Sequence, residues 1–382
     1  MDWELNKKDK AWLAETADKL KAKLAWVSEK SKEKIPFIAT ENGEHDNMAN
    51  SNPDWWTNGF WAGMLWLMYH ETGEERYAEI ARFSEKILDG CLEQYLVLHH
   101  DVGFMWLHTS VADYRLTGRE EAKRRGLHAA NILAGRFNPA GRFIRAWNDR
   151  FEEENGNKGW AIIDCMMNIP LLYWASDVTH DPHFRQIAML HADTAMANFI
   201  RPDGSVCHIV EFDPYTGAFV KSYGGQGYAE GSSWTRGQSW ALYGFALSYL
   251  HTGKQEYLDT AKKVAHYFIA NIPEDGLVPV DFRQPKEPDY RDSTANAIAA
   301  CGLIEIARHV PEYEKDMYLN AALRLLKALD TLCCRYDEGC DYIVGRGTGA
   351  YHDAAHEYPI IYGDYFYLEA IFKLNGSHIL LW

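Results

Sequence analysis

Two aspartates stand in settings that suit acid–base chemistry. Asp164 is the single charged residue in the largely apolar stretch "GWAIIDCMMNIPLLYWA", residues 159–175. Burial raises the pKa of a carboxyl group, and a general acid that works near neutral pH needs such a raised pKa. Asp101, in "LHHDVGFMWLH", follows His99 and His100. Two carboxylates on neighbouring elements are the usual equipment for cleaving glycosidic bonds, so the sequence favours a glycosidase centred on these aspartates.

A third charged side chain is suited to binding an anion. Arg236, in "SSWTRGQSW", is flanked by Trp234 and Trp240. An arginine in an aromatic setting binds a carboxylate through two parallel hydrogen bonds and stacks on a ring. The alternative role for Arg236 is an ordinary ion pair with one of the many acidic residues.

The longest irregular stretch, residues 203–232, is expected to reach over the same site. Its first half reads as a β-hairpin that turns at residues 213–217, "DPYTG", and its second half is a glycine-rich arm. A loop of this length in a compact domain is usually functional. We expect it to carry His208 and Gln226 over the mouth of the site.

The motif "HDAAH", residues 352–356, is a weak metal-binding candidate. Its two histidines lie four positions apart, but no third ligand accompanies them. The glycines of the preceding "GRGTGAY" match no phosphate-binding fingerprint. We therefore expect neither a metal ion nor an organic cofactor.

Six pairs of helices are predicted to position these side chains. Helices rich in large apolar residues alternate with more amphipathic ones, and Gly or Pro marks many of the turns between them, as in "HETGEERYAEI" and "RHVPEYEKDMYL". The apolar helices are predicted near 56–70, 102–116, 165–177, 235–250, 293–308 and 363–373, and the amphipathic ones near 8–30, 75–90, 121–136, 183–199, 255–271 and 312–334. This alternation predicts an all-α fold, a closed (α/α)6 barrel that forms a single domain over residues 1–382, with a short β-hairpin and a long loop at its mouth. An open helical solenoid is the second choice.

In a ring of helical hairpins all inner helices run in the same direction, so their first residues meet at one rim. Five of these openings contain an aspartate: Asp54, Asp101, Asp164, Asp292 and Asp364. N-capping alone, at about 1 kcal/mol each, explains an aspartate at such a place. Together, however, the five predict an acidic, aromatic-lined mouth.

The position of Asp164 within its helix follows from Pro170. Proline cannot donate a helix hydrogen bond, so the regular helix is expected to begin only shortly before it. Asp164 is therefore predicted at the rim end of the helix. At helical spacing, Trp160 and Asn168 are predicted to share its face.

Composition excludes some partners. The net charge of −15 repels nucleic acid and anionic lipid. The first residues lack the apolar core of a signal peptide, and no later run is long enough to span a bilayer. The seven cysteines show no metal-finger spacing, which favours a reducing cytoplasm. We expect a monomer or a weak homo-oligomer.

Five stretches carry a resemblance to a known family: "GFWAGMLWL", "HHDVGFM", "GWAIIDCMMNIPLLYWA", "RGQSWALYGFA" and "YGDYFYLEA". Through them the chain, over roughly residues 50–370, resembles the unsaturated glucuronyl hydrolases, glycoside hydrolase family 88. The resemblance implies an (α/α)6 barrel that acts on fragments left by polysaccharide lyases, which carry a 4,5-unsaturated uronic acid at the non-reducing end. Members of this family hydrate the C4=C5 enol ether, and the resulting hemiketal opens and releases the next sugar.

The resemblance also implies roles for individual residues. The aspartate matching Asp164 protonates C4 and activates the water that attacks C5. The aspartate matching Asp101 holds sugar hydroxyls and tunes its neighbour. Substrate binding is expected from His100, His208, Gln226, Arg236, Trp240 and one of Trp55 and Trp56.

Three enzymatic alternatives and one non-enzymatic alternative remain at this point. The sister family of unsaturated rhamnogalacturonyl hydrolases shares the fold and the chemistry, and "IIDCMMN" is the main feature that separates the two. A sugar 2-epimerase on the same fold would work through His99, His100 and His208. An inverting endo-glucanase and a carbohydrate-binding toroid rank lower. Some family members that favour sulfated substrates carry a Ser-x-x-Ser-x-Lys motif, but this chain reads "GTGAYHDAAHEYP" there, so unsulfated substrates are favoured.

Overall fold

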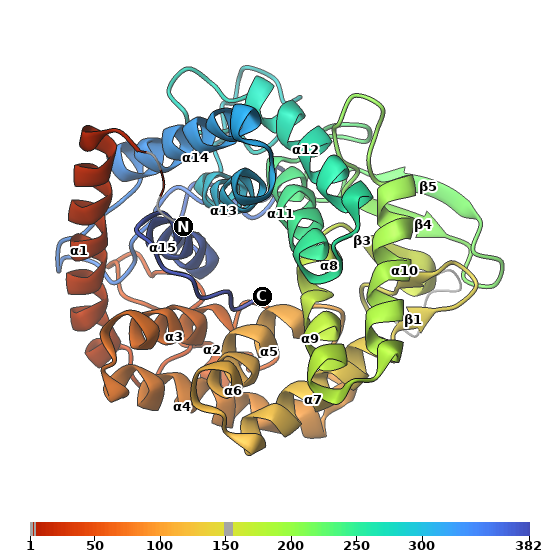
Figure 1. Cartoon of the computed structure of the whole chain (residues 1–382), viewed down its shortest axis with the longest axis horizontal. Coiled ribbons are helices and arrows are strands. Elements are labelled where there is room, and N and C mark those ends of the chain that lie inside the picture. Colours follow the sequence, from red (N-terminus) through yellow and green to blue (C-terminus); the bar gives the residue numbers. More distant parts are fainter. Residues whose placement is uncertain (1–2, 4, 149–155) are drawn as a thin grey trace.

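The helices form two concentric rings (Figure 1). The computed structural model describes residues 3, 5–148 and 156–382. The outer ring consists of α1 (Lys7–Lys30), α4 (Glu75–Glu93), α7 (Glu120–Ala134), α10 (Pro182–Asn198), α12 (Gln255–Ala270) and α14 (Glu312–Leu332). The inner ring consists of α3 (Phe60–Thr72), α5 (Val102–Trp106) with η2 (Leu107–Val111) and α6 (Ala112–Thr117), α8 (Cys165–Asn168) with α9 (Pro170–Thr179), α11 (Thr235–Thr252), α13 (Ser293–His309) and α15 (Ile361–Leu374). The ring closes where α15 packs against α3 and α13, so the predicted all-α (α/α)6 barrel is confirmed.

Three inner segments depart from regular helices near the rim. Asn58 donates from its side chain to the carbonyls of Asn52 and Pro53, at 3.0 and 2.9 Å, and the chain turns there, so α3 begins at Phe60, later than predicted. The segment η2 is a π-helix between α5 and α6, and such bulges are frequent at functional sites. The break between α8 and α9 falls immediately before Pro170, which cannot donate to the helix. The short helices α2 (Met48–Ser51), η1 (Tyr95–Val97) and η3 (Asn157–Gly159) belong to neither ring.

A three-stranded antiparallel sheet lies beside the ring. Its order is β3 (Trp160–Ile162), β4 (Ile209–Phe212) and β5 (Phe219–Tyr223). The β4–β5 hairpin and its turn were predicted and are confirmed. Strand β3 was not predicted, and the expectation that Trp160 shares a helical face with Asp164 is wrong because Trp160 belongs to this strand. Strands β1 (Phe137–Asn138) and β2 (Phe143–Ile144) form a smaller hairpin.

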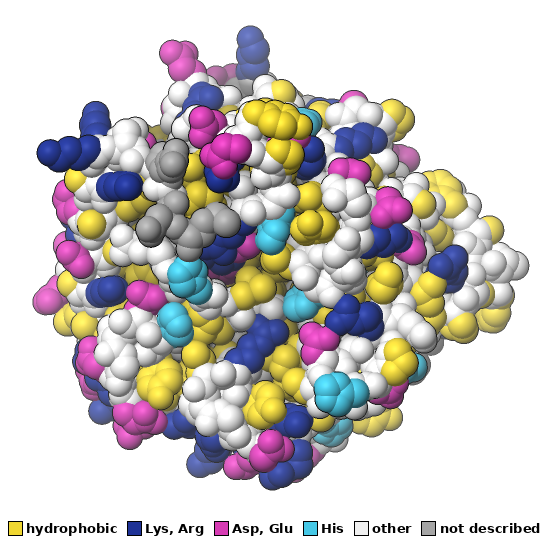
Figure 2. Space-filling view, in the orientation of Figure 1, with side chains coloured by type: hydrophobic (Ala, Val, Ile, Leu, Met, Phe, Trp, Pro, Cys, Tyr) yellow, Lys and Arg dark blue, Asp and Glu magenta, His cyan; other side chains and the backbone are white. Residues whose placement is uncertain are grey.

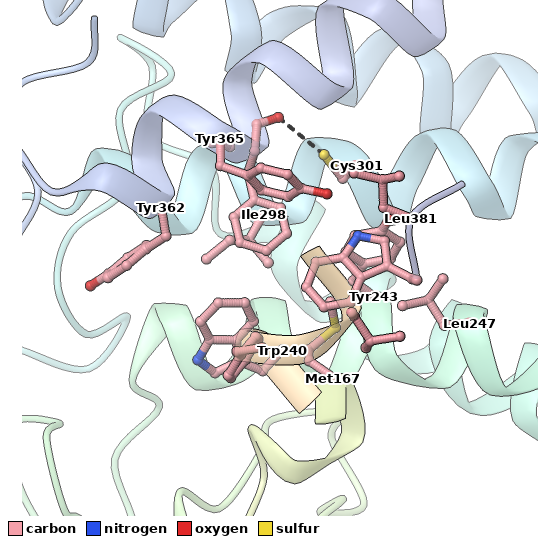
Figure 3. Packing of buried hydrophobic residues seen from close by; sticks show 14 of the residues in the cluster. Met167, Trp240, Tyr243, Leu247, Ile298, Cys301, Tyr362, Tyr365 and Leu381 are labelled. Carbon is pink, nitrogen blue, oxygen red and sulfur yellow. Dashed lines mark hydrogen bonds between the residues drawn. The ribbon is translucent and has the colours of Figure 1, made fainter. Parts of the chain in front are cut away.

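Residues 375–382 cross the interior of the ring and bury an aromatic side chain there (Figure 1). The ring of Trp382 is fully buried and stacks on Phe366, with centroids 5.6 Å apart and planes 8° apart. It meets His108 edge-on at 4.3 Å, and its Nε1 donates to Glu369 Oε2 at 3.0 Å. Figure 3 shows part of the surrounding core, with Trp240, Tyr243, Tyr362 and Tyr365 among its large side chains.

A buried charged network lies beside this tryptophan. Lys373 Nζ is 2.6 Å from Glu369 Oε1 and 2.7 Å from Glu305 Oε1, and it donates to the hydroxyl of Tyr243 at 2.6 Å. Each of the three charged residues is at most 3% exposed. Such charges are tolerated inside a protein only because they are paired and hydrogen-bonded.

Glu85 on α4 is buried with neither carboxylate oxygen hydrogen-bonded and with only a 3.5 Å ion pair to Arg125, and we expect Glu85→Gln to stabilise the protein. Burial, and then the charge of Asp113, raise the pKa of Glu85 to about 8. The unfolded chain loses this proton near pH 4.5, so Glu85 costs stability that grows as the pH rises from about 4.5 to about 8. Glu85→Gln should therefore raise the free energy of unfolding by about 1–3 kcal/mol at pH 8 and by little at pH 4.5.

Urea unfolding at the two pH values measures this gain. Arg125 lies 3.5 Å from Glu85 but keeps its contacts with Asp89 and Glu121 in the variant. The control is Glu121→Gln, which changes a half-exposed partner of the same arginine and should shift stability by less than about 0.5 kcal/mol. An equal gain from Glu85→Gln at both pH values would contradict the assignment.

Acidic and basic side chains are interspersed with apolar ones over the face shown in Figure 2. Among the described residues, none of the helices combines the length and the apolar character that crossing a bilayer requires.

Candidate active site

Asp164 sits where a strand turns into an inner helix. It occupies the residue before α8, directly after β3 and Ile163, whose N–H donates to the carbonyl of His208 at 3.1 Å. Its side chain makes no capping hydrogen bond, and 19% of it remains exposed. Asp164 therefore lies at the rim, as predicted, but its carboxylate does not cap the helix.

Asp101 lies at the start of the neighbouring inner helix and is held on two sides. Its Oδ1 accepts from Asn168 Nδ2 at 3.0 Å, and its Oδ2 lies 3.2 Å from His99 Nδ1. The side chain is 7% exposed. Here too the side chain makes no capping hydrogen bond.

His100 lies between the two carboxylates. Its Nε2 is 3.6 Å from Asp101 Oδ1 and 3.6 Å from Asp164 Oδ1. The ring is fully buried, and neither nitrogen has a hydrogen-bond partner among the described residues. Burial lowers the pKa of His100 to about 4, so the imidazole is neutral at neutral pH.

The environment separates the pKa values of the two aspartates. Burial, and then the charge of Asp101, raise the pKa of Asp164 well above its usual range. Burial also acts to raise the pKa of Asp101, but the neighbouring imidazoles and the Asn168 amide outweigh it and lower that pKa. Because His100 is neutral at neutral pH, the contacts with His99 and Asn168 supply this lowering there. The two pKa values are thus pushed apart, the arrangement from which acid and base roles follow.

The long loop carries His208, whose carbonyl accepts from the N–H of Ile163, the residue before Asp164. His208 is on the segment leading into β4, and its Nδ1 accepts from the N–H of Gln226 at 3.0 Å. Gly225 has φ +57°, and a Cβ there would lie 1.9 Å from His208 Nδ1, so this approach requires glycine. Burial, and then the charge of Arg236, lower the pKa of His208 to about 3, which leaves a neutral imidazole.

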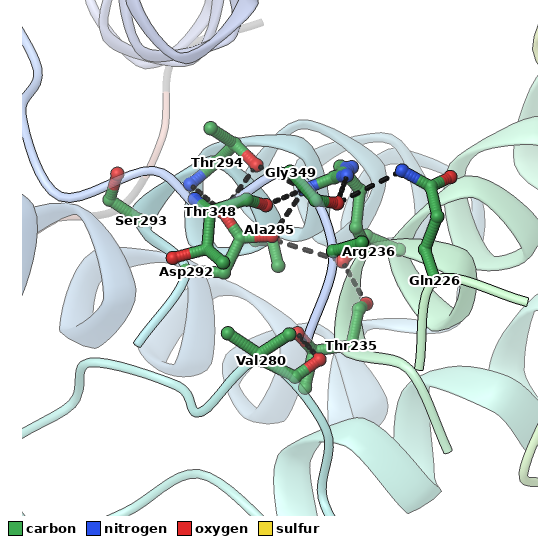
Figure 4. Close-up of polar contacts among 12 residues, drawn as sticks. Gln226, Thr235, Arg236, Val280, Asp292, Ser293, Thr294, Ala295, Thr348 and Gly349 are labelled. Atoms are coloured by element: carbon green, nitrogen blue, oxygen red, sulfur yellow. Dashed lines mark hydrogen bonds and ion pairs between the residues drawn. The ribbon is translucent and has the colours of Figure 1, made fainter. Parts of the chain in front are cut away.

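Arg236 is bound to protein groups at the start of α11. It is 2% exposed and pairs with Asp292 at 2.7 Å, while it donates to the carbonyls of Thr348 and Gly349 (Figure 4). Gln226 Nε2 donates to the same Gly349 carbonyl at 2.9 Å. The ion-pair role that the sequence left open is therefore present, and it fixes Arg236 and Gln226 side by side.

The predicted tryptophans differ in accessibility. Trp55 and Trp56 are partly exposed, and Trp56 packs 5.4 Å from Phe104 on α5. Trp240 is 1% exposed, and the centroid of its ring lies 5.2 Å from that of Phe104. Trp240 therefore packs against the helix that follows Asp101 and offers no open surface to a ligand.

Two of the five rim aspartates have structural partners. Asp292 caps α13 through the N–H of Thr294 at 3.1 Å. Asp364 is 2% exposed and accepts from the N–H groups of Ile343 and Val344. Of the other three, Asp54 is partly exposed, and Asp101 and Asp164 lie on either side of His100.

The "HDAAH" histidines have separate partners. His352 Nε2 lies 2.8 Å from the Tyr228 carbonyl, whereas His356 stacks on Tyr290 at 3.6 Å. In the described part of the chain, the one His/Cys/Asp/Glu group with ligand atoms close enough to hold a metal is His99, His100 and Asp101, within 4.8 Å of one another. These are the residues that surround the acid–base pair.

An aromatic row beside the mouth was not predicted. The Trp147 ring, 36% exposed, lies 5.9 Å from that of Trp160, which in turn lies 4.9 Å from Tyr223. Ala146 ties the row to the site, because its carbonyl accepts from the N–H of His100 and its N–H donates to the Trp160 carbonyl. The sequence offered no local signal for this row, because only the contacts of Ala146 with His100 and Trp160 bring these distant segments together.

Comparison with known proteins gives consistent relatives. The family model of Glycosyl Hydrolase Family 88 matches residues 27–331. An unsaturated glucuronyl hydrolase of Bacillus sp. (strain GL1) is 39% identical over 91% of this chain and 93% of its own length. An unsaturated chondroitin disaccharide hydrolase of Streptococcus pneumoniae (strain ATCC BAA-255 / R6) is 34% identical over 97% and 93%.

Solved structures agree in fold. The crystal structure of the Bacillus sp. GL1 unsaturated glucuronyl hydrolase superposes with a TM-score of 0.87 at 36% identity, covering 96% of this chain and 97% of that one. The unsaturated glucuronyl hydrolase from Streptococcus agalactiae gives 0.89 at 32% identity, covering 98% and 94%. With a family match over most of its length, relatives well above 30% identity and a carboxylate pair at the mouth of a helical barrel, the chain belongs to glycosyl hydrolase family 88.

Proposed function

We propose that this enzyme removes the 4,5-unsaturated uronic acid from the non-reducing end of lyase-generated oligosaccharides by hydrating its C4=C5 bond. Asp164 is the general acid and base, and Asp101 assists it. The observation that carries the proposal is the geometry of the pair: both carboxylates lie 3.6 Å from the buried Nε2 of His100. This setting raises the pKa of Asp164 and lowers that of Asp101. A single group that first donates and then accepts a proton needs a pKa near the working pH.

The chemistry is an addition of one water molecule. The proton of Asp164 moves to C4, and the electron pair of the double bond forms the new C4–H bond. The resulting cation at C5 is shared with the ring oxygen and is stabilised by the negative charge on Asp101. Water attacks C5 and gives its proton to the Asp164 carboxylate, which restores the acid. The C5 hemiketal then opens, and the hemiacetal left at C1 releases the next sugar.

We assign the binding of an anionic sugar to further residues around the pair. Arg236 is paired with Asp292 and bonded to the Gly349 carbonyl, and through that carbonyl it holds the Gln226 amide, which we assign to the substrate carboxylate. His208 and the Trp55–Trp56 pair supply hydrogen bonding and stacking for the uronic acid ring. The exposed Trp147 ring offers a platform for the sugar that leaves.

Unsulfated glycosaminoglycan disaccharides are the favoured substrates. The two kinds of relative, an unsaturated glucuronyl hydrolase and unsaturated chondroitin disaccharide hydrolases, support this class. Residues 347–359 lack the Ser-x-x-Ser-x-Lys motif of some sulfate-preferring members, which favours an unsulfated chondroitin or hyaluronan fragment.

The seven free cysteines support a cytoplasmic location.

The test follows two signals from an unsaturated, unsulfated chondroitin disaccharide. The ultraviolet absorbance reports the double bond conjugated to the carboxylate, and chromatography of quenched samples reports the released sugar. Hydration predicts that absorbance falls before or together with sugar release. Release that precedes the loss of absorbance would mean direct attack at the glycosidic carbon. Unchanged absorbance with both chondroitin and hyaluronan disaccharides would contradict the proposed substrate class.

A further inference from the structure

Asn168 connects the two helices that carry the acid–base pair. Its side chain is fully buried on α8. Nδ2 donates to Asp101 Oδ1 at 3.0 Å and to the main-chain carbonyl of Asp164 at 3.2 Å, while Oδ1 accepts from the N–H of Phe104 at 2.8 Å. A backbone N–H can only donate, so the amide oxygen must face Phe104 and the NH2 group must face Asp101.

The crossing of the two helices is built around this side chain. A Cβ at Gly103 would lie 2.4 Å from Asn168 Cα and 2.6 Å from its Oδ1. Only glycine therefore lets α5 start this close to α8. The amide of Asn168 is held by this contact and by Phe104, so it cannot turn away from Asp101.

We propose that Asn168 is the positioning residue that assigns the shared proton to Asp164. A side-chain N–H that points at a carboxylate stabilises only its ionised form. By holding Asp101 ionised, Asn168 keeps a negative charge beside Asp164, and that charge holds the proton there. The inference rests on the proposed function, because it concerns the proton that Asp164 delivers to C4.

Other groups also face the pair and enter its titration. They are His99, His100, Cys165, His208, Arg136 and Arg236. His100 and His208 are neutral at neutral pH, and Arg236 is paired with Asp292. Arg136 Nη2 donates to the Ala146 carbonyl. Asn168 differs from these groups because its donor points at Asp101 whatever the pH.

The test replaces this donor by an oxygen. Asn168→Asp keeps the shape and the acceptor for Phe104, but it sets a second carboxylate against Asp101, and the two then share a proton. We expect the acidic limb of the kcat profile to move up by at least about one pH unit and kcat at the optimum to fall by about 100-fold. KM should change by less than about threefold, because the substrate-facing groups stay in place.

A matched control exists on α13. Asn296 is also fully buried, donates to the Gly276 carbonyl at 2.7 Å and accepts from the N–H of Val278 at 3.0 Å. Asn296→Asp should lower stability and leave the shape of the pH profile unchanged. If Asn168→Asp does not fold, Asn168→Ser, which removes the amide without adding a charge, must show the same upward movement of the acidic limb.

The outcomes separate the two proposals. A wild-type enzyme that leaves the absorbance of its disaccharide unchanged contradicts the proposed function itself. An active wild type whose pH profile is superimposable on that of Asn168→Asp, or of Asn168→Ser, overturns the role of Asn168. A profile that moves equally in Asn296→Asp would also overturn it, since the effect would then be merely structural.

Discussion

Replacing Asp164 by Asn is expected to lower kcat on the unsaturated disaccharide by about 10³–10⁴-fold. The amide has nearly the same shape as the protonated carboxyl group, but it neither gives a proton to C4 nor takes one from water. The wild-type profile should be bell-shaped, falling at low pH as Asp101 gains a proton and at high pH as Asp164 loses its own. Initial rates of absorbance loss across the pH range measure both effects.

Asp364→Asn is the control for this substitution. Asp364 also lies at the rim end of an inner helix, and burial raises its pKa to about 7. Its carboxylate, however, accepts hydrogen bonds from the N–H groups of Ile343 and Val344. The variant should lose stability and keep kcat within about threefold. Retention of more than a tenth of the activity in Asp164→Asn would mean that another group supplies the proton.

Trp382→Ala is expected to cost about 3–5 kcal/mol of unfolding free energy. The substitution removes a fully buried ring from between Phe366 and His108. It also leaves Glu369 Oε2 without the Nε1 donor of Trp382, in a region where buried charges rely on their partners. Urea unfolding monitored by circular dichroism would measure the loss.

Two further variants define the origin of that cost. Trp382→Phe keeps the stacking but loses the hydrogen bond, and should cost about 1–2 kcal/mol. Tyr313→Ala removes a ring that is 85% exposed and should change stability by less than about 0.5 kcal/mol. Equal costs for Trp382→Ala and Tyr313→Ala would contradict the view that residues 375–382 complete the core.

The helical framework could be predicted because its signals are local. Runs of large apolar residues, ended by Gly or Pro, marked each inner helix to within a few residues. The rim position of Asp164 followed from Pro170 alone. The β4–β5 hairpin was found because its turn, residues 213–217, has a strong local signature.

What was missed depends on contacts between distant segments. Trp160 was assigned to a helix because strand β3 exists only through its pairing with β4, about fifty residues away. The position of Trp147 beside Trp160 likewise depends on the hydrogen bond from Ala146 to the Trp160 carbonyl. The sequence around Trp382 has no periodic pattern. Its burial depends on the shape of the interior that the inner helices enclose. The protonation of Asp101 and Asp164 depends on Asn168 and His99, whose distances no spacing in the sequence could give.

The parallel direction of the inner helices gives the molecule an electrical polarity. Long helices α11, α13 and α15 all direct their N-terminal ends, which carry the partial positive charge of the helix dipole, toward the rim that holds the carboxylate pair. The chain as a whole carries a net charge of −15. The topology therefore places three positive helix ends at the rim of a chain that is negative overall, and these ends favour an anionic group that reaches the rim.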